Sequence, residues 1–321
     1  MLAFGEVQTG LLQNSTALSR RATEKLIASA VDERVRTVER PIGRTSSSDQ
    51  LEGVDCMLPT VSGRQTRGVG TVLARVAIVG GHAVQGSACV QVVPAGNPTR
   101  LPWSHYLNQP GQLEAIGKLD LKDVALGVVN GTSTPKSLEL GAITTRMVDT
   151  VQRAQLIDHA PPLRASRTRL RWTAQLDQAL DEPEGTFTLI SEELRTIELR
   201  MPVTDLRSVE VLCEDLALHD WLLTTVLSVV EAALTHDHSR AERVSRLQPL
   251  LEHLLHLWMP AAHVPDQLLP VWAALDQRPG LTRQWQSVVA RIRDQITVET
   301  LDRLQAVDVR RPSGRIPPPA G

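Results

Sequence analysis

Residues 67–93, RGVGTVLARVAIVGGHAVQGSACVQVV, decide the class of fold. Their pattern is compatible either with a glycine-rich phosphate loop or with a pair of strands. Apolar residues alternate with a period of two on both sides of Gly80-Gly81, and such alternation is typical of β-strands. A Gly-Gly pair between two such runs indicates a hairpin, because tight hairpin turns need positive φ angles.

A dinucleotide-binding loop is the alternative interpretation of the same residues. That loop requires the pattern G-x-G-x-x-G between a strand and a helix. Here Gly68-Val69-Gly70 is followed by Leu73 where the third glycine is needed, and the alternating residues after it disfavour a helix. The pattern therefore favours a hairpin with Gly80-Gly81 at its turn.

The same kind of reading, carried along the chain, predicts two domains. Strands are expected at 2–12, 35–43, 167–176, 184–190 and 195–201, helices at 15–30, 120–129 and 138–154, and loops at 46–50 and 94–111. After Pro202 only helical periodicity remains, with helices expected from 204 to about 234, from 239, at 268–275 and from 281 to about 307. We predict an α+β N-terminal domain of mostly antiparallel strands with a few helices (1–203), an all-α helical C-terminal domain (204–308) and a disordered Pro-rich tail (309–321).

Composition restricts the classes of function. The net charge is −2 and neither half of the chain is basic, which argues against nucleic-acid binding. Three separated cysteines without a CxxC motif fit a reducing compartment. The N-terminus has no signal-peptide pattern, and the longest apolar stretch, 221–234, is too short for a membrane span. We expect a soluble cytoplasmic protein with no membrane association.

Four arginines form the most distinctive polar motif. Arg167, Arg169 and Arg171 alternate along one expected strand, and Arg164 lies just upstream. Alternation points the three strand arginines to the same side, where they suit a phosphate or a carboxylate. A solvated strand face paired with acids explains the same pattern. Trp172 points to the opposite side and is expected in the core.

The long helix after residue 204 is acidic and has no lysine or arginine between Ser208 and Ser239. It lacks the internal ion pairs that usually support an exposed helix. Its acids are therefore expected to meet arginines elsewhere, either in the N-terminal domain, with the arginine stripe as one candidate, or on a partner. The candidate interaction residues are Glu210, Glu214, Asp215 and Asp220.

Histidines, cysteines and catalytic motifs are the remaining candidates for chemistry. His253 and His256 lie three residues apart and could share a metal ion, although leucines and a tryptophan surround them. Cys213 lies beside Glu214, which would raise the pKa of the thiol rather than lower it. The sequence contains no G-x-S-x-G and no P-loop motif, so we assign no catalytic residue and no cofactor.

Four stretches, GVDCMLPT (53–60), RGVGTVLARV (67–76), RTRLRW (167–172) and CEDLALHDWLLTT (213–225), resemble a conserved actinobacterial family without an assigned activity. The resemblance covers most of residues 1–235. It implies a gene neighbourhood with a variant P-loop protein and a methyltransferase-like protein, and hence a part of a multi-protein system.

Two functions of different classes follow as hypotheses. The first is a non-enzymatic interaction or assembly component that binds a protein partner, such as that P-loop protein, or a second copy of itself. The second is a domain that binds, or acts on, an anionic ligand through the arginine stripe. The two differ in whether the stripe lines a concave pocket or lies beneath the acidic helix.

Overall fold

The centre of the protein is one large mixed β-sheet. The computed structural model describes residues 1–321 except 133–135, 178–179, 181, 203–204, 236–239 and 311–321. The sheet order is β2-β3-β5-β7-β6-β1-β8-β10-β9, and β4 also pairs with β5. The strands are β1 Leu2–Leu11, β2 Val35–Val38, β3 Arg44–Ser47, β4 Gln50–Met57, β5 Arg67–Val79, β6 Ala83–Pro94, β7 Gln112–Ile116, β8 Thr168–Leu176, β9 Glu184–Leu189 and β10 Leu194–Met201.

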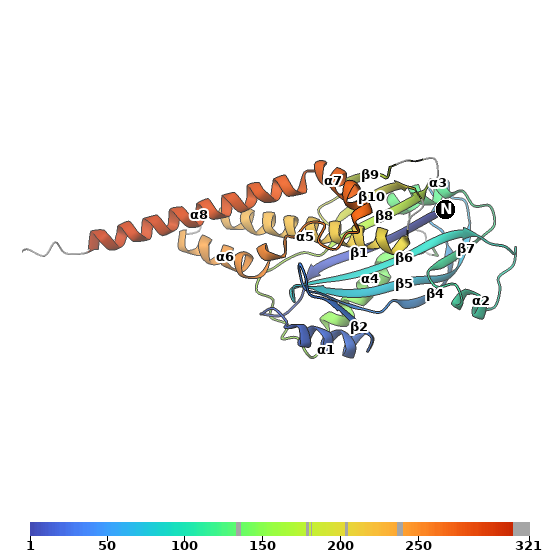
Figure 1. The fold of residues 1–321 in the computed structure, drawn as a ribbon, viewed down its shortest axis with the longest axis horizontal. Helices are drawn as coiled ribbons and strands as arrows, with labels where there is room; N and C mark the ends of the chain where they lie inside the picture. Colours follow the sequence, from blue (N-terminus) through green and yellow to red (C-terminus); the bar gives the residue numbers. More distant parts are fainter. Residues whose placement is uncertain (133–135, 178–179, 181, 203–204, 236–239, 311–321) are drawn as a thin grey trace, which may run out of the picture.

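Helices cover both faces of this sheet (Figure 1). The helices are α1 Arg20–Ala30, α2 Trp103–Leu107, α3 Leu121–Val129, α4 Leu140–Gln152, α5 Leu206–Thr235, α6 Arg240–His253, α7 Leu269–Gln277 and α8 Leu281–Arg310. One face carries α1, α3 and α4, and the other carries α5 with the C-terminal helices. The broad fold prediction, strands first and helices in the C-terminal part, is confirmed at this level.

The hairpin interpretation of residues 67–93 is confirmed. β5 and β6 pair antiparallel from Leu73↔Cys89 to Val79↔Ala83, so Gly80 and Gly81 lie in the turn. Their φ angles are +58° and +70°, a region that favours glycine. A Cβ atom on Gly81 would also lie 2.4 Å from the carbonyl oxygen of Leu18. These glycines therefore serve backbone geometry and not phosphate binding.

Burial on both faces explains why β5 is apolar on both sides. Val72, Val76 and Ile78 contact the core beneath α1, α3 and α4, whereas Val79 belongs to the core beneath α5. A strand that is buried on both faces has no need of polar residues at alternate positions. Arg75 is the exception, and its partners are described below.

Two local predictions are wrong. Of the loop predicted at 46–50, only residues 48–49 lie outside the strands, because β3 and β4 form at the edge of the sheet, where half-burial of polar side chains suffices. The Pro-rich segment contains the short helix α2. Most strand pairs are antiparallel, as predicted, whereas β6–β7 and β8–β10 are parallel pairs.

α5 lies inside the molecule. By length and composition Leu206–Ala233 could cross a membrane, but 67% of its most apolar stretch is buried inside the protein. Leu212, Leu216 and Trp221 contact the same core cluster as Trp172 of β8 and Ile197 of β10. One apolar core therefore joins the residues before and after the predicted boundary at 203. The predicted tail, from 311 onwards, lies outside the described residues.

Candidate functional site

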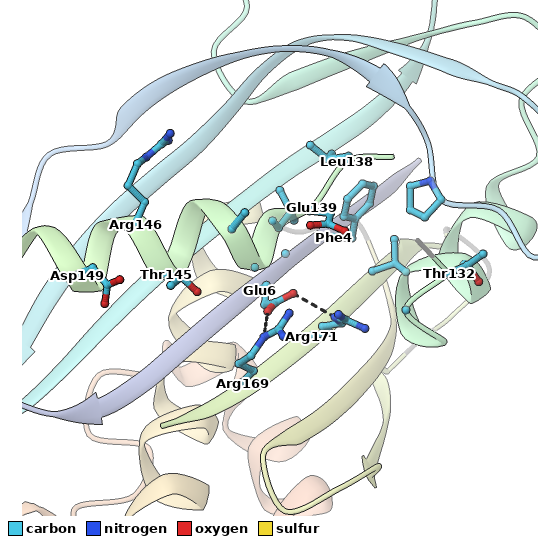
Figure 2. Close-up of a pocket in the computed structure, with 18 of the residues that line it drawn as sticks. Phe4, Glu6, Thr132, Leu138, Glu139, Thr145, Arg146, Asp149, Arg169 and Arg171 are labelled. Carbon is cyan, nitrogen blue, oxygen red and sulfur yellow. Dashed lines mark hydrogen bonds and ion pairs between the residues drawn. The ribbon is translucent and has the colours of Figure 1, made fainter. Parts of the chain in front are cut away.

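A cavity of about 620 Å³ opens between α3, α4 and the strands β1 and β8. Figure 2 shows β1 as its floor, α4 along one side, and Arg169 and Arg171 of β8 along the other. The close approach of α4 to the sheet is set by Gly86 of β6, where a Cβ atom would lie 2.6 Å from the carbonyl oxygen of Thr144. The arginine stripe thus faces a pocket and not the acidic helix.

A single buried carboxylate organises the two arginines. Glu6 is 3% exposed and lies opposite Arg171 in the β1–β8 register. Its two oxygens accept from Arg169 Nε and, at 3.1 Å, from Arg171 Nε (Figure 2). Within the described part of the chain, the terminal nitrogens of both guanidinium groups have no acceptor. Two positive charges therefore share one negative charge, and four N–H-bearing nitrogens stay available to the cavity.

Two glycines leave room for these guanidinium groups. A Cβ atom on Gly131 would lie 2.2 Å from Arg171 Nη1, and one on Gly141 would lie 2.3 Å from Arg169 Nη2. Burial works against the charged form of Arg169, but the hydrogen bond and charge of Glu6 outweigh it, so the pKa of Arg169 is raised. The arginines are thus held in place as cations before any ligand arrives.

The other stripe arginines have different surroundings. Arg167 points to the same face and donates to Asp149 of α4 at 2.7 Å, which closes the pocket at that end. Arg164 is exposed and does not line the pocket. The predicted set of four therefore contains two pocket arginines, one structural arginine and one surface arginine.

The acids of α5 lie on the opposite face of the sheet, where other arginines meet them. Arg75 of β5 donates to Glu214 at 2.7 Å and to Glu210 at 2.6 Å, and Arg44 reaches Glu214 at 2.5 Å. Burial works against the Glu214 carboxylate, but the charges of Arg75 and Arg44 outweigh it and lower its pKa. Burial raises the pKa of Glu210 to about 7 against the opposing charge of Arg75.

The remaining acids are also paired within the chain. Asp220 forms an ion pair with Arg195 of β10, and burial raises the pKa of Asp220 to about 6. Asp215 accepts from the indole N–H of Trp272 at 2.8 Å and from the backbone N–H of Ala261 at 2.9 Å. All four candidate interaction residues are at most 6% exposed. They belong to an internal interface between α5, the sheet and the C-terminal helices.

His253 and His256 lie against a third histidine, His82, in the hairpin turn. The ring centroids of His253 and His256 are 4.8 Å and 5.8 Å from that of His82. Among the described residues, no group of three or more His, Cys, Asp or Glu side chains is placed to hold a metal ion. Burial and the two neighbouring rings lower the pKa of His82 to about 4, and burial lowers the pKa of His256.

This cluster predicts acid sensitivity. Because the pKa of His82 is about 4 when folded and about 6.5 when unfolded, the unfolded chain binds a proton first. The contribution of His82 to the free energy of unfolding should be fully present above pH 6.5, and the free energy should fall by about 2 kcal/mol towards pH 4. This is less than the full shift in the pKa of His82 would give, because water reaches the cluster. Urea titrations of the protein and of His82→Gln from pH 7.5 to 4.5 measure the difference. Parallel profiles would contradict it.

Thiol chemistry is disfavoured at all three cysteines, which are free. Burial, and then Asp55, raises the pKa of Cys56 to about 11. Burial also raises the pKa of Cys89 and Cys213 well above the ordinary value, and Glu214 contributes at Cys213 as predicted. At neutral pH these groups are thiols, which are poor nucleophiles.

Sequence reasoning found Arg169 and Arg171 but missed Glu6, Asp149 and the glycines. Glu6 is an isolated acid in a mixed apolar and polar strand, and only its register with β8 shows its role. The one signal in the sequence was the alternation of Phe4, Glu6 and Gln8, which puts a charge on an otherwise half-apolar face.

Comparisons of the chain with protein-family models, with curated proteins and with solved structures found no match.

Proposed function

We propose that this protein binds a small anionic ligand in the pocket between α3, α4 and β8. The observation that carries the proposal is the arrangement of Arg169 and Arg171, whose Nε atoms are both bound by Glu6 while their terminal nitrogens remain open to the cavity. An arginine held in this way presents an end-on fork, which suits a carboxylate or phosphate oxygen pair. Catalysis on that ligand is the alternative role of the same site.

The physical setting supports binding. A cavity of about 620 Å³ lies within the range of sites for small organic ligands. Glu6 fixes the guanidinium groups in advance, so less side-chain entropy is lost when a ligand binds. Arg169 and Arg171 are only partly exposed, which weakens the screening of their charge by water.

Removal of one pocket charge should abolish ligand binding. Arg171→Gln leaves Glu6 paired with Arg169, so the buried carboxylate keeps a partner and the site loses its surplus positive charge. In a thermal-shift screen of carboxylates, phosphates and nucleotides, a ligand at 100 times its Kd should raise the Tm of the unmodified protein by about 3 °C or more. The same ligand should leave the Tm of Arg171→Gln unchanged.

A matched control is available in the neighbouring strand. Arg200 of β10 is paired with Asp177 and Glu184 but lies outside the pocket, so Arg200→Gln should keep the full shift. The triple variant Glu6→Gln, Arg169→Gln, Arg171→Gln removes all three charges together and should also lose the shift. The proposal is wrong if no anion shifts the unmodified protein, or if Arg171→Gln responds like Arg200→Gln.

We propose assembly with a protein partner or a second copy as a second function, because α8 projects from the body of the molecule. Figure 1 shows its C-terminal part extending beyond α5 and α6. Its first part is anchored in the core through Leu281, Trp285, Val288 and Ile292. The partner proposed from sequence, a P-loop protein of the same neighbourhood, and the cytoplasmic location belong to this proposal.

Deletion of residues 299–321 tests the assembly role. The deletion keeps the buried residues of α8 named above, so the Tm should change by less than about 2 °C. A dimer or a complex captured by the full chain should be lost. Light scattering coupled to gel filtration measures the mass of both proteins. A monomeric full chain that captures no partner would rule the role out.

A further inference from the structure

We infer that the ligand of this pocket is a singly charged carboxylic acid with an uncharged, largely apolar body, and not a phosphate monoester. This inference rests on the proposed function and concerns the charge that the site accepts. It follows from the number of charges in the pocket and from the position of its apolar wall.

The side chains that line the pocket carry one more positive charge than negative charges. Arg169 and Arg171 share Glu6, Arg167 and Arg153 share Asp149, and Arg146 pairs with Glu52. Glu139, the residue that precedes α4, also lines the pocket and lies close enough to act on the charge of Arg169. The charged side chains that line the pocket are therefore four arginines and three carboxylates, namely Arg146, Arg153, Arg169, Arg171, Glu6, Glu139 and Asp149.

A single negative charge balances this surplus. A carboxylate between Arg169 and Arg171 brings the site to neutrality. A phosphate dianion would add a further negative charge in a partly desolvated space that already holds Glu6, Glu139 and Asp149. Because repulsion between charges is strong where water is limited, the second charge should cost affinity.

The rest of the cavity supplies an apolar wall. Phe4 and Leu138 lie together at one end (Figure 2), and Pro59 and Val128 also line the pocket. At the other end, Asp149 is already bound by Arg167 and Arg153. An uncharged body therefore fits the space beside the arginines better than an ammonium group or a second anion.

Phenylacetate, phenylacetamide and phenyl phosphate test this inference by isothermal titration calorimetry. They share one apolar ring and carry one, zero and, at pH 8, two negative charges, since the second pKa of a phosphate ester is about 6. The unmodified protein should bind phenylacetate at least about fivefold tighter than phenyl phosphate. Phenylacetamide should give no measurable binding.

Glu6→Gln should reverse the expected order of the phenylacetate and phenyl phosphate affinities, because loss of the carboxylate makes the net charge of the site more positive by one. The ratio of the phenyl phosphate affinity to the phenylacetate affinity should rise at least about tenfold. Glu198→Gln, an exposed acid on β10, is the matched control and should leave the ratio unchanged. The ratio in the unmodified protein tests the inference even where Glu6→Gln fails to fold.

The outcomes separate the inference from the proposed function. Tighter binding of phenyl phosphate by the unmodified protein, or an unchanged ratio in folded Glu6→Gln, overturns the charge inference and leaves an anion site. Equal binding of phenylacetamide and phenylacetate overturns the anion site itself. Absence of binding by all three compounds overturns both.

Discussion

Arg75→Ala is expected to destabilise the protein by about 3–5 kcal/mol, or to prevent its folding, because it removes the buried cation that contacts two buried carboxylates and leaves Glu214 with Arg44 and Glu210 with Arg207. The Arg75 side chain is 4% exposed and contacts both Glu210 and Glu214 of α5. A typical protein is stable by only 5–15 kcal/mol in total, so this loss is a large fraction. Urea unfolding followed by tryptophan fluorescence measures it.

The cause of that loss can be separated from lost packing. Adding Glu210→Gln and Glu214→Gln to Arg75→Ala removes the two carboxylates that have lost Arg75 and should recover at least about half of the lost stability. Arg200→Ala, which breaks exposed ion pairs, should cost no more than about 1 kcal/mol. The buried network has no special role if Arg75→Ala costs as little as Arg200→Ala.

Residues 1–203 expressed alone are expected not to fold cooperatively. Without α5 and the later helices, Leu170, Trp172, Ile197 and Leu199 would lie open to water on one face of the sheet. Arg195 would also lose Asp220. An exposed apolar face of this kind favours aggregation or a loosely packed state.

Calorimetry and dye binding check this second prediction. The fragment should show no cooperative thermal transition and should bind the apolar dye ANS, whereas the full chain should show one transition and little dye binding. Residues 204–310 supplied in trans should restore the transition in part. A cooperative transition of the fragment alone would instead establish the boundary near 203 as a true domain boundary.

Local patterns in the sequence were sufficient wherever a structure depends on neighbouring residues. The turn at Gly80-Gly81, the strand 168–176 with Trp172 in the core, and the strands β9 and β10 follow from alternation and turn chemistry. The helices α3, α4, α5 and α8 follow from helical periodicity. Alternation also placed Arg167, Arg169 and Arg171 on one side, as observed.

The sequence was insufficient where polar segments gain their structure from a partner. β3 and β4 pair with β5, and their own residues carry little strand signal. The acids of α5 were correctly expected to meet arginines of the same chain or of a partner, but the arginines are Arg44, Arg75 and Arg195, which no local pattern connects to α5.

By itself, then, the sequence determined most of the elements, the hairpin and the shared side of the arginine stripe, because these depend on contacts within a few residues. Only the tertiary structure decided what the stripe faces. Glu6 meets Arg169 and Arg171 because β1 pairs with β8 in one register, across more than 160 residues of chain. A shift by one residue would turn Glu6 to the other face, so the pocket exists through strand pairing that no local pattern encodes.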